Sequence, residues 1–123
     1  MNQVSFDISS ERRDGGVVVI TIAGELELRA GADLKSRLSD AVDSGARTIV
    51  VDMSAVTFID STGLGALVGG LKRVRAVDGE LALVCVDRSI VRIFEITGLD
   101  RVFPLHETLA DALSHVQLPV AAS

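Results

Sequence analysis

The residues best suited to carry chemistry lie in one glycine-rich stretch, Phe58–Leu71, which reads FIDSTGLGALVGGL. Asp60 and Ser61 come directly before a helical pattern, so their side-chain oxygens can accept from free backbone N–H groups of its first turn. A phosphate on Ser61 would face those N–H groups and the positive end of the helix dipole. It would also add about two negative charges beside Asp60. The stretch predicts reversible phosphorylation of Ser61, and the alternative is that Ser61 only caps the helix.

A helical wheel divides this helix into two faces. The apolar face, which we expect to pack on a sheet, consists of Leu64, Leu67, Val68, Leu71 and Val74. The opposite face consists of Thr62, Gly63, Gly65, Ala66, Gly69 and Gly70. Four helical glycines cost about 3–4 kcal/mol relative to alanine. We predict that they form a bare face against which a partner's backbone docks. The alternatives are a loop of this chain covering the face, or a helix that merely tolerates glycine.

The rest of the chain has no catalytic or metal-binding pattern. Ser61 is not in a Gly-x-Ser-x-Gly elbow, and Asp60 has no second aspartate motif with which to share a proton. His106 and His115 are typical of surface histidines, and no Cys/His cluster suits a metal. Cys85 lies in an apolar run and is predicted to be a buried small hydrophobe. We therefore expect no enzyme activity, no catalytic residue, no metal and no cofactor.

A dinucleotide-binding enzyme fragment is the main alternative from another class. An apolar strand at 48–53, the glycines Gly63, Gly65 and Gly69, and the later Asp87 loosely imitate a Rossmann unit. In that unit the glycines follow the strand directly, whereas about nine residues separate Met53 from Gly63. The chain also lacks a second half for a cofactor site, so the pattern disfavours this reading.

Length and composition indicate a single globular domain. The chain has 123 residues, of which 48% are hydrophobic and 24% are charged. A net charge of −5 and only 3% aromatic residues disfavour nucleic acid as a partner. The chain has no apolar run of about 20 residues for a membrane span and no signal-peptide pattern. The single cysteine fits a reducing compartment, so we expect a cytoplasmic protein.

The spacing of apolar residues and turn signals predicts an α/β fold with a mixed sheet. The expected elements are strands at 4–8 and 17–23, a helix around 34–42, a strand at 48–53, a helix at 62–77, a strand at 81–86, a helix around 90–97, an edge strand at 102–105 and a helix around 109–116. The first two strands should pair antiparallel, with Gly24 ending the second strand. Gly45 and Gly98 should end their helices, and Thr108 with Asp111 resembles a capping box.

The sequence resembles the STAS-domain family of anti-sigma factor antagonists, in particular its actinobacterial members. The resemblance extends from Val4 to about Val116 and is strongest at Asp52-Met53, Phe58–Gly65 and Ile96–Leu99. It implies one domain over 1–117, with four helices and a mixed sheet of four to five strands. Residues 118–123 are expected to form a disordered tail.

The resemblance also implies a partner-switching function. The unphosphorylated antagonist would bind an anti-sigma factor that is also a serine kinase, and so release a sigma factor. Phosphorylation by that kinase would end binding, and a serine phosphatase would restore it. The residue corresponding to the family's phosphoacceptor is Ser61. The expected partner-binding residues are Glu25, Glu27, Asp60, Ser61, Thr62, Gly63, Gly65 and Gly69.

One loop departs from the family pattern. Glu27 stands where aspartate is usual and Ala30 where threonine is usual, in a loop expected near Ser61. The departure bears on kinase specificity and not on the fold. Two other functions remain open within the same fold: a STAS module of a multi-protein sensor complex, and a STAS domain that binds a small ligand.

Overall fold

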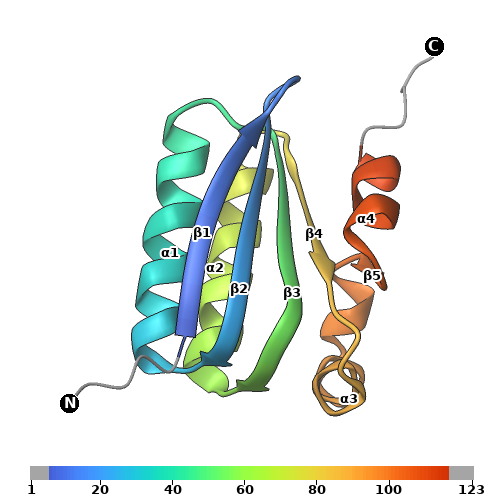
Figure 1. The fold of residues 1–123 in the computed structure, drawn as a ribbon. Coiled ribbons are helices and arrows are strands. Elements are labelled where there is room, and N and C mark those ends of the chain that lie inside the picture. Colours follow the sequence, from blue (N-terminus) through green and yellow to red (C-terminus); the bar gives the residue numbers. More distant parts are fainter. Residues whose placement is uncertain (1–5, 117–123) are drawn as a thin grey trace.

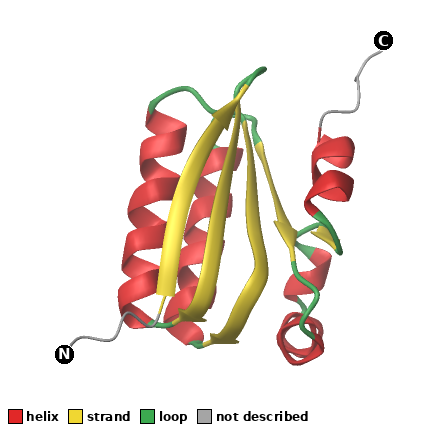
Figure 2. Ribbon diagram, in the orientation of Figure 1, coloured by secondary structure: helices red, strands yellow, loops and turns green. Residues whose placement is uncertain are grey.

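The computed structural model describes residues 6–116, and the expected tail at 118–123 lies outside them. The elements, in order, are β1 (Phe6–Arg13), β2 (Val17–Leu26), α1 (Leu28–Asp43), β3 (Thr48–Ile59), α2 (Ser61–Arg75), β4 (Glu80–Val84), α3 (Arg88–Thr97), a 3-10 turn (Leu99–Arg101), β5 (Leu105–His106) and α4 (Leu109–Val116). The strands form one sheet in the order β1-β2-β3-β4-β5 (Figures 1 and 2). Among the strands of residues 6–116, β1 pairs antiparallel with β2, and β2 to β5 are parallel. The predicted α/β fold with a mixed sheet is confirmed.

Helices cover both faces of the sheet. The main core lies between one face and α1, α2 and α3, and its fully buried side chains include Ile20, Leu38, Leu67 and Phe94. A smaller cluster on the other face packs against α4 and consists of Val17, Val19, Val50, Val84 and Ala112. Figure 1 shows α1 and α2 side by side against the sheet and α4 across the sheet from them. Both helix layers are amphipathic because their outer faces meet solvent.

β3 is twice as long as the strand predicted at 48–53, and this length positions the site. Its register with β2 shifts at two places, between Thr21 and Ala23 and between Gly24 and Glu25, and β3 contributes an extra residue at each. Beside the first shift, the carboxylate of Asp52 accepts from the backbone N–H and the hydroxyl of Ser54, at 3.0 and 2.7 Å. Polar residues follow Met53, so the apolar pattern of the sequence does not show that the strand continues to Ile59.

β2 also continues beyond its predicted end at Gly24 and stops at Leu26. Leu26 then pairs with Ile59 at the end of β3, so α1 and α2 start beside each other at one edge of the sheet. The last strand differs as well: β5 covers only Leu105–His106, after Pro104, and not 102–105. The helix ends at Gly45 (φ +103°) and Gly98 (φ +79°) are as predicted.

Candidate phosphorylation and docking site

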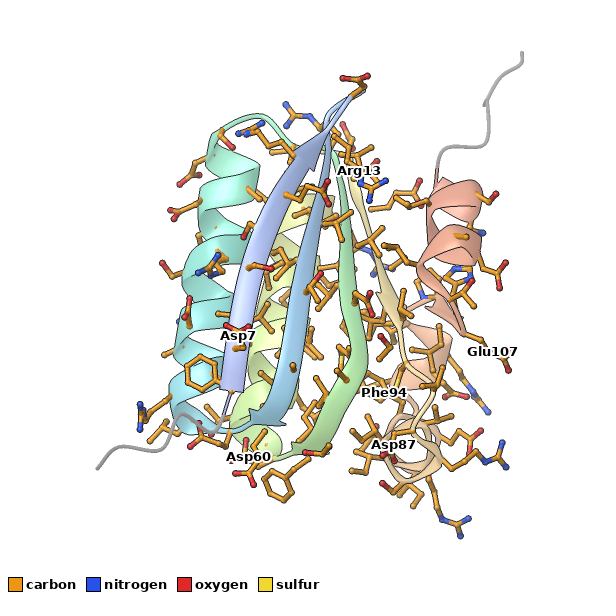
Figure 3. The ribbon with its side chains drawn as sticks, in the orientation of Figure 1. Asp7, Arg13, Asp60, Asp87, Phe94 and Glu107 are labelled. Carbon is orange, nitrogen blue, oxygen red and sulfur yellow. The ribbon has the colours of Figure 1, made fainter. Side chains whose placement is uncertain are left out.

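Three helices begin at the C-terminal ends of parallel strands, and each has an acidic N-cap residue. A carboxylate oxygen of Glu27 accepts from the N–H groups of Arg29 and Ala30 at 3.0 and 3.2 Å. Asp60 caps α2 and Asp87 caps α3, and Figure 3 shows both at the same end of the molecule. Hydrogen bonds from the hydroxyl and backbone N–H of Ser89 hold the pKa of Asp87 below its ordinary value. The helix starts thus carry negative charge before any phosphate is added.

Ser61 is the first residue of α2 and is exposed to solvent. The cap itself is Asp60, whose Oδ1 accepts from the backbone N–H of Gly63 at 3.0 Å. The sequence placed both residues at the cap, and the structure assigns that role to Asp60 alone. Within residues 6–116, the Ser61 hydroxyl has no hydrogen-bond partner. It is therefore open to a modifying enzyme without loss of a helix cap.

The loop between β2 and α1 lies against the start of α2, as expected for the segment with the family departures. The backbone N–H of Asp60 donates to the carbonyl of Leu26 at 3.3 Å. Glu25, exposed, pairs in register with Phe58. Glu27 caps α1 as an aspartate would, whereas the fully buried Ala30 lacks both the hydroxyl and the γ-methyl group of a threonine. The departure leaves the cap intact and removes one polar group from this end.

The predicted bare face of α2 is wrong at three of its residues. Gly63, Ala66 and Gly70 are buried. A Cβ on Gly63 would lie 2.5 Å from the carbonyl oxygen of Leu26, and one on Gly70 would lie 2.4 Å from Cδ1 of Leu38. These glycines let α2 approach β2 and α1 closely. A helical wheel for α2 shows which side chains can face a sheet, but α1 is a second neighbour that the wheel does not contain.

The other two glycines of the face, Gly65 and Gly69, are different. A Cβ at either would meet no atom within 4 Å. Both line a groove of about 620 Å³ between α1 and α2. We call this the α1–α2 groove; its lining residues are Leu28, Gly31, Ala32, Lys35, Thr62, Gly65, Ala66, Gly69, Gly70 and Arg73. The α1 half of the groove was not predicted, although the sequence holds a signal for it. The spacing of one helix face is shared by Leu28, Gly31, Ala32 and Lys35.

Two large apolar side chains are exposed at the end of the molecule where α1 and α2 begin. Leu28 retains 65% of its accessible surface and Phe58 retains 49%. Leu28 belongs to the groove, and Phe58 lies in β3 just before Asp60. Exposed apolar surface beside charged groups is typical of protein-binding sites. The surroundings of Ser61 have that composition.

The other candidate reactive side chains are Cys85, His106 and His115. Cys85 is buried, and desolvation raises the pKa of its thiol to about 11, which keeps it protonated. The rings of His106 and His115 lie 5.0 Å apart, and desolvation together with His115 lowers the pKa of His106. Residues 6–116 contain no group of three or more His, Cys, Asp or Glu side chains placed to hold a metal.

The structure does not support a dinucleotide-binding site, but the distance in sequence between the strand and the glycines is not the reason. β3 runs to Ile59, so only three residues separate the strand from Gly63. The residues themselves do not fit a pyrophosphate: Gly63 packs against the carbonyl of Leu26, and its backbone N–H already donates to Oδ1 of Asp60. None of the helices described in residues 6–116 is long and apolar enough to cross a membrane.

The sheet order and the paired helix starts define a small α/β domain with helices on both faces of a mixed sheet. The chain belongs to the STAS domain family, whose family model matches residues 10–112. A Staphylococcus aureus (strain NCTC 8325 / PS 47) protein named anti-sigma-B factor antagonist is 38% identical over 88 residues, covering 72% of this chain and 82% of that protein. The resemblance inferred from the sequence is therefore confirmed.

Solved structures agree with this assignment. The crystal structure of an anti-sigma factor antagonist from Mycobacterium paratuberculosis has a TM-score of 0.83 at 31% identity, covering 92% of this chain and 95% of that one. SpoIIAA, described as an anti-sigma factor antagonist in its unphosphorylated form, has a TM-score of 0.79 at 27% identity, covering 90% and 96% of the two chains. The phosphorylated form of SpoIIAA, a Bacillus cell fate determinant, has a TM-score of 0.73 at 27% identity, covering 90% and 100%.

Proposed function

We propose that this chain is an anti-sigma factor antagonist that acts in the cytoplasm. Its unphosphorylated form binds an anti-sigma factor and so releases a sigma factor. The proposal is supported by the family, by relatives that carry this name, and by a structural neighbour solved in both phosphorylation states. The function is regulatory, through binding and release of a partner.

The phosphoacceptor in this proposal is Ser61, and the observation that carries it is the position of its hydroxyl. Ser61 is exposed at the first position of α2, while Asp60 supplies the cap. A kinase can therefore modify Ser61 without removing a bond that holds the helix. The anti-sigma factor itself is the proposed kinase, and a serine phosphatase reverses the step.

The proposed switch is electrostatic. A phosphate on Ser61 adds about two negative charges next to the carboxylate of Asp60. Two more acidic residues belong to the adjoining segment: Glu25 near the end of β2 and Glu27 at the N-cap of α1. Docking against this surface would bury those charges. An uncompensated buried charge typically costs about 3–5 kcal/mol, which corresponds to a loss of roughly a few hundred- to a few thousand-fold in affinity.

Incubation with ATP and each purified serine-kinase anti-sigma factor of the same organism tests the phosphoacceptor. Mass spectrometry should place a single phosphate on Ser61, and the variant Ser61→Ala should remain unmodified. Thr62 is the adjacent exposed hydroxyl, and it should carry no phosphate in either protein. Undiminished phosphorylation of Ser61→Ala would remove Ser61 from the proposal.

A further inference from the structure

The folding of this chain does not require glycine at positions 65 and 69. A Cβ added to Gly31, Gly63 or Gly70 would lie within 3.3 Å of a neighbouring segment, so a side chain at these positions is resisted. Gly65 and Gly69 face open space, and a Cβ at either position would meet no atom within 4 Å. Glycine is also less favourable than alanine inside a helix. Contacts within the described residues therefore do not account for two bare positions one helical turn apart, and a binding partner would.

These two glycines belong to the α2 wall of the α1–α2 groove. Residues four apart lie on one face of a helix, so Gly65 and Gly69 expose a continuous strip of backbone. The opposite wall on α1 is also shallow, because it contains Gly31 and Ala32. A small-xxx-small strip allows a second helix to pack with its backbone unusually close. The groove therefore fits a helix that lies along it.

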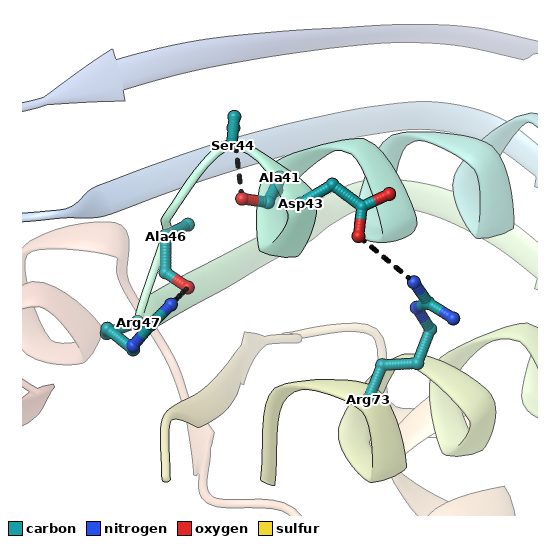
Figure 4. A network of polar contacts seen from close by, with 6 residues as sticks. All are labelled: Ala41, Asp43, Ser44, Ala46, Arg47 and Arg73. Atoms are coloured by element: carbon teal, nitrogen blue, oxygen red, sulfur yellow. Dashed lines mark hydrogen bonds and ion pairs between the residues drawn. The ribbon is translucent and has the colours of Figure 1, made fainter. Parts of the chain in front are cut away.

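The groove has two different ends. α1 and α2 start at the same edge of the sheet, so Leu28 and Thr62 lie at the end near Ser61. Lys35 and Arg73 lie further along their helices. Arg73 reaches across to α1 and pairs with Asp43 at 3.3 Å (Figure 4). Within residues 6–116, Lys35 is exposed and makes no salt bridge.

The charge of the groove is opposite to that of the protein. The chain has a net charge of −5, yet both charged residues that line the groove are cations. Complementary charge across an interface sets register and suppresses wrong partners. A bound segment with an acidic side chain within reach of Lys35 would complement the positive charge of the groove. A basic helix would meet two cations instead.

We propose that the α1–α2 groove receives an amphipathic helix of the anti-sigma factor, with small side chains against Gly65 and Gly69 and an acidic side chain at Lys35. This inference rests on the proposed function, because it names a binding element of that partner. The contact surface then extends from Ser61 along the sides of α1 and α2. Phosphorylation of Ser61 acts at one end of this surface. The partner's helix contacts the groove along its length, and the fit of its small side chains gives specificity.

Leucine substitutions test the shape of the groove. Gly65→Leu and Gly69→Leu should each weaken binding of the purified anti-sigma factor by about tenfold or more, measured by calorimetry. Both variants should fold, since a Cβ at either position meets no neighbouring segment within 4 Å and leucine is a better helix former than glycine. The control is Ala110→Leu, at an exposed position of α4 on the opposite face of the sheet, which should bind as the unmodified chain does. Binding of both groove variants at full affinity would overturn the proposal.

Charge reversal tests the acidic contact. Lys35→Glu should weaken binding by about fivefold or more, and the loss should shrink at high salt. Lys72→Glu makes the same change of charge at an exposed position of α2 that does not line the groove, and it should have less than about twofold effect. Equal losses in the two variants would mean that only the net charge matters, which contradicts a specific contact at Lys35.

Cross-linking identifies the occupant. A cysteine introduced as Gly69→Cys can carry a short photo-activated cross-linker, because buried Cys85 with its raised pKa does not react in the native fold. Mass spectrometry should locate the cross-link in an acidic helical segment of the anti-sigma factor. A cross-link to a second copy of this chain, or to a basic segment, would overturn the inference. Binding of no anti-sigma factor by the unmodified chain would instead refute the proposed function.

Discussion

Replacing each glycine of α2 in turn by alanine should separate two kinds of glycine with the same chemical change. Gly65→Ala and Gly69→Ala add a methyl group that meets no atom within 4 Å. Gly63→Ala places a methyl carbon 2.5 Å from the backbone carbonyl oxygen of Leu26. Gly70→Ala places one 2.4 Å from a methyl carbon of Leu38, whose side chain is fully buried. The substitutions should therefore change stability in opposite directions.

The expected magnitudes follow from two effects. Alanine in place of a helical glycine stabilises by about 0.8–1 kcal/mol, and this is the whole effect at Gly65 and Gly69. Overpacking a filled site costs about 1–3 kcal/mol. Gly63 should lie at the upper end of that range because a backbone atom must move, which leaves a net loss of about 2 kcal/mol. Gly70 should lose roughly 0–2 kcal/mol, because the Leu38 side chain can adjust a little.

Urea unfolding followed by circular dichroism measures these differences directly, provided the slope m stays constant across the set. For a chain of this size, a change of about 1 kcal/mol corresponds to a melting-temperature shift of about 3–6 °C. Gly65→Ala and Gly63→Ala should thus differ by about 3 kcal/mol, with opposite signs relative to the parent chain. Stabilisation by Gly63→Ala, or destabilisation by Gly65→Ala, would contradict the packing of α2 against β2 and α1.

Two further predictions concern helix capping and pH. Asp60→Ala should lower the unfolding free energy by about 1 kcal/mol through loss of the cap bond to Gly63, and Asp60→Asn should retain most of it, as urea titrations can check. The melting temperature should fall as the pH is lowered from about 7 to about 5, because His106 has a pKa below its ordinary 6.5 in the folded chain and the unfolded chain takes up the proton first. His106→Gln should reduce that fall, and an unchanged pH dependence would exclude His106 as its source.

Most of the fold can be predicted from local patterns. The β-branched run at 48–53 and the apolar stripes of α1 and α3 indicate buried elements, because these patterns match the period of each element. Glycines at the ends of helices, such as Gly45 and Gly98, adopt positive φ values that other residues avoid. The position of Ser61 next to a helix start is equally local. These features depend on a few neighbouring residues and need no knowledge of the tertiary structure.

The parts that could not be predicted depend on contacts between distant segments. The continuation of β3 past Met53 relies on pairing with β2 and on bulges that no periodicity shows. The burial of Gly63 and Gly70 depends on Leu26 and Leu38, which lie more than 30 residues away in the sequence. A helical wheel describes one helix and omits its neighbours. For the same reason it missed the α1 wall of the groove.

The central claim is that a phosphate on Ser61 ends partner binding without disturbing the fold. It is tested by measuring the melting temperature and the affinity for the anti-sigma factor on matched unphosphorylated and Ser61-phosphorylated protein. The unfolding free energies should agree within about 1 kcal/mol, because the helix dipole and open N–H groups of α2 favour an anion. Affinity should fall by roughly a few hundred-fold or more. Unchanged affinity, or a melting temperature that collapses together with affinity, would contradict the electrostatic switch.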